Sequence, residues 1–219
     1  MIDLRSYKDS LTLTEFNDMD FGSVPFIGRG KSGKSLAMYS FLEACPEQRS
    51  RPKAFYRFPP EVFQKFPSDY QAYAVNSFDE VLPGSIVILE DAARLFPSRS
   101  TKGLELQQIM GVASHNDLLI LSTVQTLANV DQCLLRDQRV LLICKLFDWF
   151  GISFERDELK ELEYEADIII KDIAERYGVD YHLISYCPEF SEALIAPPPG
   201  WYGYEISHAL RGLKILGVA

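Results

Sequence analysis

The sequence predicts an α/β domain in which helices flank a central, mostly parallel sheet. Two observations support this prediction. Apolar runs of strand length alternate with segments of helical periodicity, which is typical of strands joined by right-handed helical crossovers. In addition, a chain of 219 residues that is 47% apolar and 24% charged is long enough and apolar enough to bury the core of one such domain.

The expected elements follow in order along the chain. Residues 1–20 are polar and are expected to form an irregular or capping lead-in. Apolar runs of strand length predict strands at residues 24–27, 54–58, 70–75, 85–89, 117–122 and 140–146. Helical spacing and helix-start residues predict helices at 34–44, 60–66, 104–114 and 155–177, with a brief one from residue 77. Gly178 is well placed to cap the longest of these helices.

The order of elements suggests one domain over residues 1–190, with its functional core at about 22–150, and a tail over 191–219. The tail contains a proline-rich spacer at 196–200, which is semi-rigid, and then Trp201, Tyr202 and Tyr204. Such a tail can dock on a neighbouring subunit or another partner, or it can fold back on its own domain. We slightly favour the second arrangement.

Composition limits the classes of protein to which this chain can belong. The four cysteines and three histidines show no metal-ligand spacing, so we expect reduced thiols, as in a cytoplasmic protein, and no metal cluster. No apolar run reaches the roughly 18 residues that span a bilayer, so we expect no integral membrane segment. The net charge is −9, but residues 155–176 hold nine acids and four bases, a net of −5. A basic patch elsewhere therefore remains compatible with the composition.

A glycine-rich segment between a predicted strand and a predicted helix matches the phosphate-loop pattern G-x-x-x-x-G-K-[ST] in full. Its residues are Gly28, Arg29, Gly30, Lys31, Ser32, Gly33, Lys34 and Ser35. Such a turn points backbone N–H groups and a helix N-terminus at phosphate oxygens. We expect Lys34 to reach the β- and γ-phosphates and Ser35 to ligate Mg²⁺. Arg29 and Lys31 are either further phosphate contacts or solvated loop residues. ATP and Mg²⁺ are thus the expected cofactors.

Two acids supply the groups that hydrolysis needs in addition to a phosphate loop. Glu90 and Asp91 follow the apolar strand 85–89, at the carboxyl end where α/β sheets bind ligands. One of them is expected to hold the Mg²⁺ water shell, and the other to orient or deprotonate the attacking water. Gln125, just past the strand 117–122, can sense the γ-phosphate or position water. These residues together predict an ATPase.

The order of these motifs resembles the HerA/FtsK superfamily of P-loop ATPases. The chain is most similar to genome-packaging ATPases of membrane-containing icosahedral viruses, with Zot-like phage proteins as cousins. The resemblance covers about residues 22–150. It rests on GRGKSGKS at 28–35, IVILEDAARLF at 86–96, SHNDLLILSTVQ at 114–125 and VDQCLLRDQR at 130–139.

The resemblance implies a RecA-like fold and a homo-oligomeric ring, usually a hexamer. It also implies ATP-driven movement of double-stranded DNA into a preformed capsid, with a capsid or vertex protein as a further partner. The expected location is the host cytoplasm or the virion. Arg136 or Arg139 falls where the family places an arginine directed at a neighbouring subunit's nucleotide. The alternative for either arginine is a surface ion pair with a nearby aspartate.

The chain departs from the family in its second motif, which commonly ends Asp-Glu and here ends Glu90-Asp91. The longer acid therefore occupies the metal-holding position, and the division of roles within the pair stays open. The basic segment 92–103 follows directly and contains no acid. Its Arg94, Arg99 and Lys102 are candidate contacts for DNA phosphates in the pore of a ring, or else a solvated loop.

Three other functions fit the same phosphate loop. One is a protein assembly or export ATPase of Zot-like type, although such proteins usually carry a membrane segment. Another is a small-molecule or nucleoside kinase, although no arginine-rich lid appears in the sequence. The last is a nucleotide switch that hydrolyses slowly.

Overall fold

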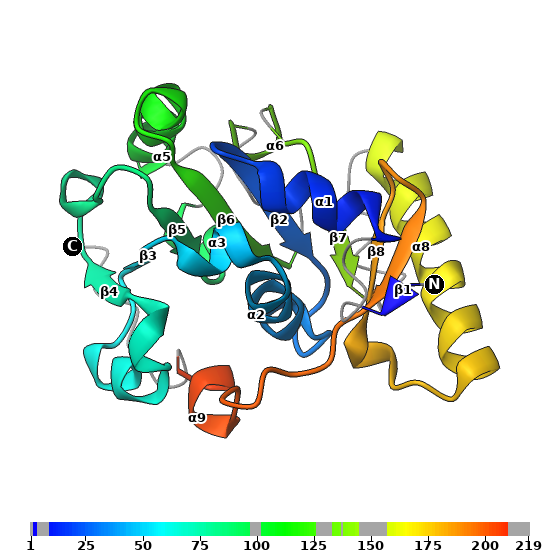
Figure 1. Cartoon of the computed structure of the whole chain (residues 1–219). Helices are drawn as coiled ribbons and strands as arrows, with labels where there is room; N and C mark the ends of the chain where they lie inside the picture. The colour runs from blue at the N-terminus through cyan, green and yellow to red at the C-terminus, as the bar shows by residue number, and fades with distance from the viewer. Residues whose placement is uncertain are drawn as a thin grey trace.

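The computed structural model describes residues 2–3, 9–96, 102–125, 133–136, 138–144 and 157–209. Within this part the chain forms a nine-stranded sheet in the order β1-β9-β8-β7-β2-β6-β5-β3-β4 (Figure 1). The strands are β1 (Ile2–Asp3), β2 (Gly22–Ile27), β3 (Lys53–Tyr56), β4 (Ala72–Val75), β5 (Ile86–Leu89), β6 (Leu119–Val124), β7 (Leu142–Cys144), β8 (Ile184–Cys187) and β9 (Glu192–Ile195).

The centre of the sheet is parallel, as the sequence predicts. The strands β7, β2, β6, β5, β3 and β4 pair in parallel with one another in that order, whereas β8 pairs antiparallel with both β7 and β9. The pairing of β2 with β6 runs along both strands from Gly22↔Leu119 to Ile27↔Val124. Because β6 also pairs with β5, it lies between the strand that enters the glycine-rich loop and the strand that ends at Glu90. The carboxyl ends of all three strands therefore meet at one edge.

Helices cover both faces of the sheet, and each face buries its own apolar cluster. They are α1 (Leu11–Asp18), α2 (Lys34–Ala44), α3 (Pro46–Ser50), α4 (Ala92–Leu95), α5 (Lys102–Val112), α6 (Cys133–Arg136), α8 (Asp157–Tyr177) and α9 (Tyr204–Ser207). Shorter 3-10 turns are η2 (Pro60–Lys65), η3 (Ser68–Tyr70), η4 (Phe78–Glu80), η5 (Ala113–His115) and η7 (Tyr181–Leu183). Side chains of α1 and α2 pack on one face, and those of α4, α5, α6 and α8 pack on the other.

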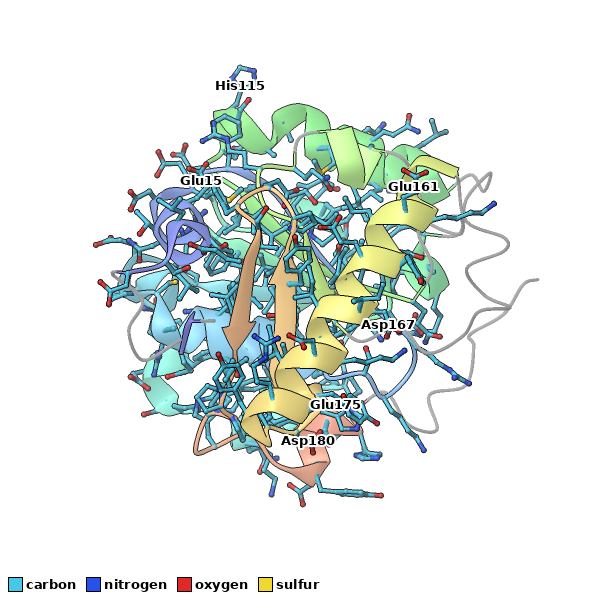
Figure 2. The ribbon with its side chains drawn as sticks, turned by 90° about the vertical axis from the view of Figure 1, so that its right-hand side faces the viewer. Glu15, His115, Glu161, Asp167, Glu175 and Asp180 are labelled. Atoms are coloured by element: carbon cyan, nitrogen blue, oxygen red, sulfur yellow. The ribbon has the colours of Figure 1, made fainter. Side chains whose placement is uncertain are left out.

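The long charged helix is confirmed as α8, and Gly178 follows it with φ of 63°. Figure 2 shows α8 lying beside the hairpin β8–β9, with Glu161, Asp167 and Glu175 along its length. Its apolar stripe is buried through Ala166, Ile170 and Ile173. The acidic segment is thus a helix with one face packed on the core.

Two predictions from the sequence are wrong. Residues 1–20 are not an irregular lead-in, because they contain α1. The Ser10 side chain caps α1 by accepting a hydrogen bond from Leu13 N, and Glu192 of β9 accepts hydrogen bonds from Leu11 N and Thr12 N at 2.9 and 3.0 Å. The expected helix at 60–66 is instead the 3-10 segment η2, which ends ahead of Pro67.

The described part of the C-terminal tail folds back on the domain, which is the arrangement that we favoured. The ring of Trp201 lies 5.1–5.6 Å from those of Tyr39, Phe66 and Tyr70. Its indole Nε1 donates to Glu43 Oε1 at 3.0 Å. These contacts place α9 beneath α2 in Figure 1. Separately, no helix among the described residues is long and apolar enough to cross a membrane.

Candidate active site

The glycine-rich loop connects β2 to α2 at the carboxyl edge of the sheet. Gly28 has φ of 155°, and a Cβ there would lie 2.5 Å from Ser32 Oγ and 2.7 Å from the Cys144 carbonyl oxygen. Gly33 has φ of 93°, and a Cβ there would lie 2.2 Å from the His182 carbonyl oxygen. Only glycine fits either position. The loop therefore has the tight path that brings backbone N–H groups to phosphate oxygens.

Lys34 begins α2 and turns its ammonium group back over the loop. Its Nζ donates to the Arg29 carbonyl oxygen at 2.7 Å. Burial lowers the pKa of Lys34, while the nearby Cys144, Glu90 and Asp91 act to raise it. Glu90 and Asp91, which follow β5, thus act electrostatically on the lysine that is expected to bind phosphate.

Glu90 is the buried carboxylate of the site, with 9% of its surface exposed. It accepts hydrogen bonds from three hydroxyl groups: Ser35 Oγ at 2.8 Å, Thr123 Oγ1 at 3.0 Å and Tyr39 OH at 3.2 Å. Burial raises the pKa of Glu90, and these three bonds and the charge of Lys34 partly oppose the rise. The structure thus brings together Ser35 and Glu90, which the sequence predicts as magnesium ligands.

Asp91 leaves the strand in a left-handed conformation, with φ of 56°. Its backbone N–H donates to Thr123 Oγ1 at 2.8 Å, and its Oδ2 lies 3.8 Å from Nε of Arg94. Thr123 thus contacts both acids, since its hydroxyl accepts from Asp91 and donates to Glu90. The two carboxylates have different partners, because Glu90 accepts from three hydroxyl groups whereas Asp91 lies near Arg94.

These groups line one cavity of about 230 Å³. Its lining consists of Gly30, Lys31, Lys34, Ser35, Phe58, Glu90, Asp91, Thr123, Gln125, Ile206, Ser207 and His208. The cavity thus brings loop residues together with both acids and with Gln125, as the sequence analysis expects. Hydroxyl and carboxylate oxygens are ligands that Mg²⁺ binds, so the pair Ser35–Glu90 fits that ion.

The motifs do not predict every contributor to this site: Tyr39, Phe58, Thr123 and the tail residues also belong to it. Tyr39 lies four residues after Ser35, so a helical spacing argument could have placed both on one side of α2. Thr123 lies two residues before Gln125, and strand periodicity could have placed them on one face of β6. The tail residues that line the cavity carry no local signal, because their position depends on how the tail folds back.

The other candidate residues lie elsewhere. Arg139 lies 3.6 Å from Glu15 Oε1, and its guanidinium is 5.6 Å from the ring centre of Phe21. Arg136 ends α6 and Lys102 begins α5, but their side chains lie outside the described part, as does Arg99 entirely. Among the three basic residues after β5, the structure thus places only the side chain of Arg94.

Comparison with known proteins finds similar structures, but at low sequence identity. No protein-family model matches the chain, and no curated protein does. The structure is similar to the genome packaging NTPase B204 of Sulfolobus turreted icosahedral virus 2 in complex with ATP-gammaS. The identity is 12% and the TM-score 0.54, over 83% of this chain and 99% of that one. The DNA-packaging ATPase B204 of Sulfolobus turreted icosahedral virus matches at 13% identity and a TM-score of 0.54, over 82% and 98%.

A third similar structure is the N-terminal domain of zonular occludens toxin from Neisseria meningitidis. It matches at 22% identity and a TM-score of 0.41, over 56% of this chain and 76% of that domain, which is too distant to support an argument. The resemblance to genome-packaging ATPases that the motifs predict is confirmed at the level of the fold. The chain has the α/β fold of these P-loop ATPases, with a phosphate loop in the expected place.

Proposed function

We propose that this chain hydrolyses ATP and uses the energy to move double-stranded DNA. The observation that carries the hydrolytic part is the buried carboxylate of Glu90, bonded to the phosphate-loop hydroxyl of Ser35 at 2.8 Å. A carboxylate contributes no apolar packing, and burying it without hydrogen-bond partners would cost free energy. Its three hydroxyl partners keep it close to where a nucleotide-bound metal ion would lie.

The geometry suggests a division of roles within the acidic pair. Glu90 and Ser35 would hold Mg²⁺, which when bound neutralises charge on the β- and γ-phosphates. Asp91, held by Thr123, is then the group that orients or deprotonates the attacking water. Gln125 lines the same cavity and is suited to position that water or to contact the γ-phosphate.

Lys34 would exchange its present acceptor, the Arg29 carbonyl oxygen, for a phosphate oxygen. This exchange is favourable because a charged acceptor bonds an ammonium group more strongly than a neutral carbonyl does. The backbone N–H groups of the loop would hold the remaining phosphate oxygens.

The DNA-moving part of the proposal rests on the likeness to B204, whose structures span nearly the same length of chain. The basic segment after β5 supports it. Arg94 approaches Asp91, so a DNA phosphate that drew Arg94 away would change the charge beside the attacking water. A homo-oligomeric ring, expected as a hexamer, would direct Arg136 of one subunit toward its neighbour's nucleotide and package DNA into a capsid.

The deciding experiment measures ATP hydrolysis with and without double-stranded DNA, together with the mass of the assembly. We expect turnover that DNA stimulates and a mass that corresponds to a ring. Turnover that DNA leaves unchanged would remove the DNA-moving role and favour protein export or a switch. Phosphate transfer to a nucleotide acceptor would favour a kinase.

A further inference from the structure

The C-terminal segment lies against the phosphate site. It is attached to α2, the helix that begins at the phosphate loop. Ser40 Oγ donates to the Pro197 carbonyl oxygen at 2.9 Å, and the indole of Trp201 donates to Glu43, three residues further along the same helix. The rings of Trp201 and Tyr202 each lie 5.6 Å from that of Tyr39. Since the Tyr39 hydroxyl donates to Glu90, one side chain links the tail to the buried carboxylate.

The next turn of the tail, α9, is also docked. Ile206 is buried with 5% of its surface exposed, and Glu205 Oε2 lies 2.6 Å from Lys65 Nζ of η2. The docked turn directs Ile206, Ser207 and His208 into the wall of the phosphate cavity. A titratable side chain thus joins the site from a segment that lies outside the four motifs.

Both hydrogen-bond contacts of the His208 ring in the described part of the chain involve Nδ1, which leaves Nε2 available for a ligand. Its Nδ1 lies 3.1 Å from the Tyr204 carbonyl oxygen and 2.8 Å from the Ser207 hydroxyl. The Ser207 hydroxyl also lies 2.9 Å from the same carbonyl oxygen, to which it can donate. The ring stacks on Tyr204 with 4.0 Å between centroids. No bond to Nε2 is seen within the described part of the chain.

We propose that His208 is a further residue of the nucleotide site and that its Nε2 contacts the terminal phosphate of ATP. This inference rests on the proposed function. The terminal phosphate is the group concerned because His208 shares its cavity with Asp91 and Gln125, at the ends of β5 and β6. The His182 carbonyl approaches the loop at Gly33, and neither of these residues lines the cavity. An Nε2–H group can donate a charge-assisted hydrogen bond to an anionic phosphate oxygen.

The test compares the affinities of ATPγS and ADP for the full chain, by calorimetry in the presence of Mg²⁺. His208→Ala should weaken ATPγS binding by about tenfold or more, the effect of losing a hydrogen bond to a charged group. ADP affinity should not change, because ADP lacks the terminal phosphate. His208→Gln should recover part of the loss, since its amide can still donate. His115→Ala, a histidine that Figure 2 shows at the molecular surface away from α9, is the matched control.

Two results would overturn the inference. Equal weakening of ATPγS and ADP would mean that His208 acts on the inner phosphates or on tail docking. Unchanged ATPγS affinity in His208→Ala, while Lys34→Ala loses binding, would refute a role for His208 and leave the proposed ATPase intact. If Lys34→Ala also bound ATPγS like the wild type, the proposed function itself would fail.

Discussion

Thr123→Val tests whether the hydroxyl of β6 holds both acids in place. Valine keeps the shape of threonine but removes the donor to Glu90 Oε2 at 3.0 Å and the acceptor for Asp91 N at 2.8 Å. A hydrogen bond to a charged group contributes about 1.5–3 kcal/mol, and an unpaired buried amide costs about 1–3 kcal/mol. We therefore expect Thr123→Val to lower the free energy of unfolding by about 3 kcal/mol. For a chain of this size that lowers Tm by roughly 6–12 °C.

The same variant should also change how activity depends on pH. The Thr123 hydroxyl is one of the groups that lower the pKa of Glu90 against the effect of burial. Without it the pKa of Glu90 rises further, so the carboxylate is lost earlier as pH falls. The acidic limb of the ATPase pH profile should therefore move to higher pH in Thr123→Val.

The matched control is the preceding residue of the same strand. Ser122 is buried, and its Oγ has no hydrogen-bond partner in the described part of the structure. Ser122→Ala should therefore keep the wild-type pH profile and nearly the wild-type Tm. If Thr123→Val behaved like Ser122→Ala in both measurements, the hydroxyl would not position the acids and the reasoning would be refuted.

Three further predictions address the loop, the ring and DNA. Gly33→Ala sets a methyl group against a backbone carbonyl at positive φ, so ATP binding should be lost, and calorimetry showing wild-type affinity would contradict it. Arg136→Ala should stop turnover but spare ATP binding, and mixing it with wild type should reduce activity more than in proportion to dilution. A proportional fall would exclude a role in trans. Neutralising Arg94, Arg99 and Lys102 together should weaken DNA binding and flatten its salt dependence, whereas unchanged affinity would remove the basic segment from the DNA site.

Much of the fold was predictable because its signals are local. The predicted helix 34–44 coincides with α2, and the predicted strand 85–89 differs from β5 by one residue. Both follow from continuous apolar runs or helical spacing next to turn residues. Parallel pairing followed from the alternation of strands and helices.

What the sequence missed depends on contacts between distant segments. The first turn of α1 is completed by Glu192, about 180 residues away along the chain. The N-terminal stretch is polar and carries no local signal of this contact, so its sequence alone does not predict the helix. The hairpin β8–β9 was not predicted either; β9 ends directly before the proline-rich segment.

The candidate site likewise combines features that local motifs predict with features that depend on contacts between distant segments. The pattern of the phosphate loop and the acids after a buried strand predicted the meeting of Ser35 with Glu90, which the structure bears out. The part played by Thr123 depends on the register in which Leu89 pairs with Ser122, and a single sequence does not contain that register. The catalytic and DNA-binding roles of these residues stay predictions until they are measured.

The measurement that tests the central claim most directly is phosphate release from ATP by the wild type and by Lys34→Ala, with Mg²⁺ and double-stranded DNA present. Lys34 reaches back across the loop to the Arg29 carbonyl oxygen, and Glu90 and Asp91 act to raise its pKa. The account predicts steady phosphate release by the wild type and none above background by Lys34→Ala. Undiminished release by Lys34→Ala would contradict the assignment of this loop as the site of ATP hydrolysis.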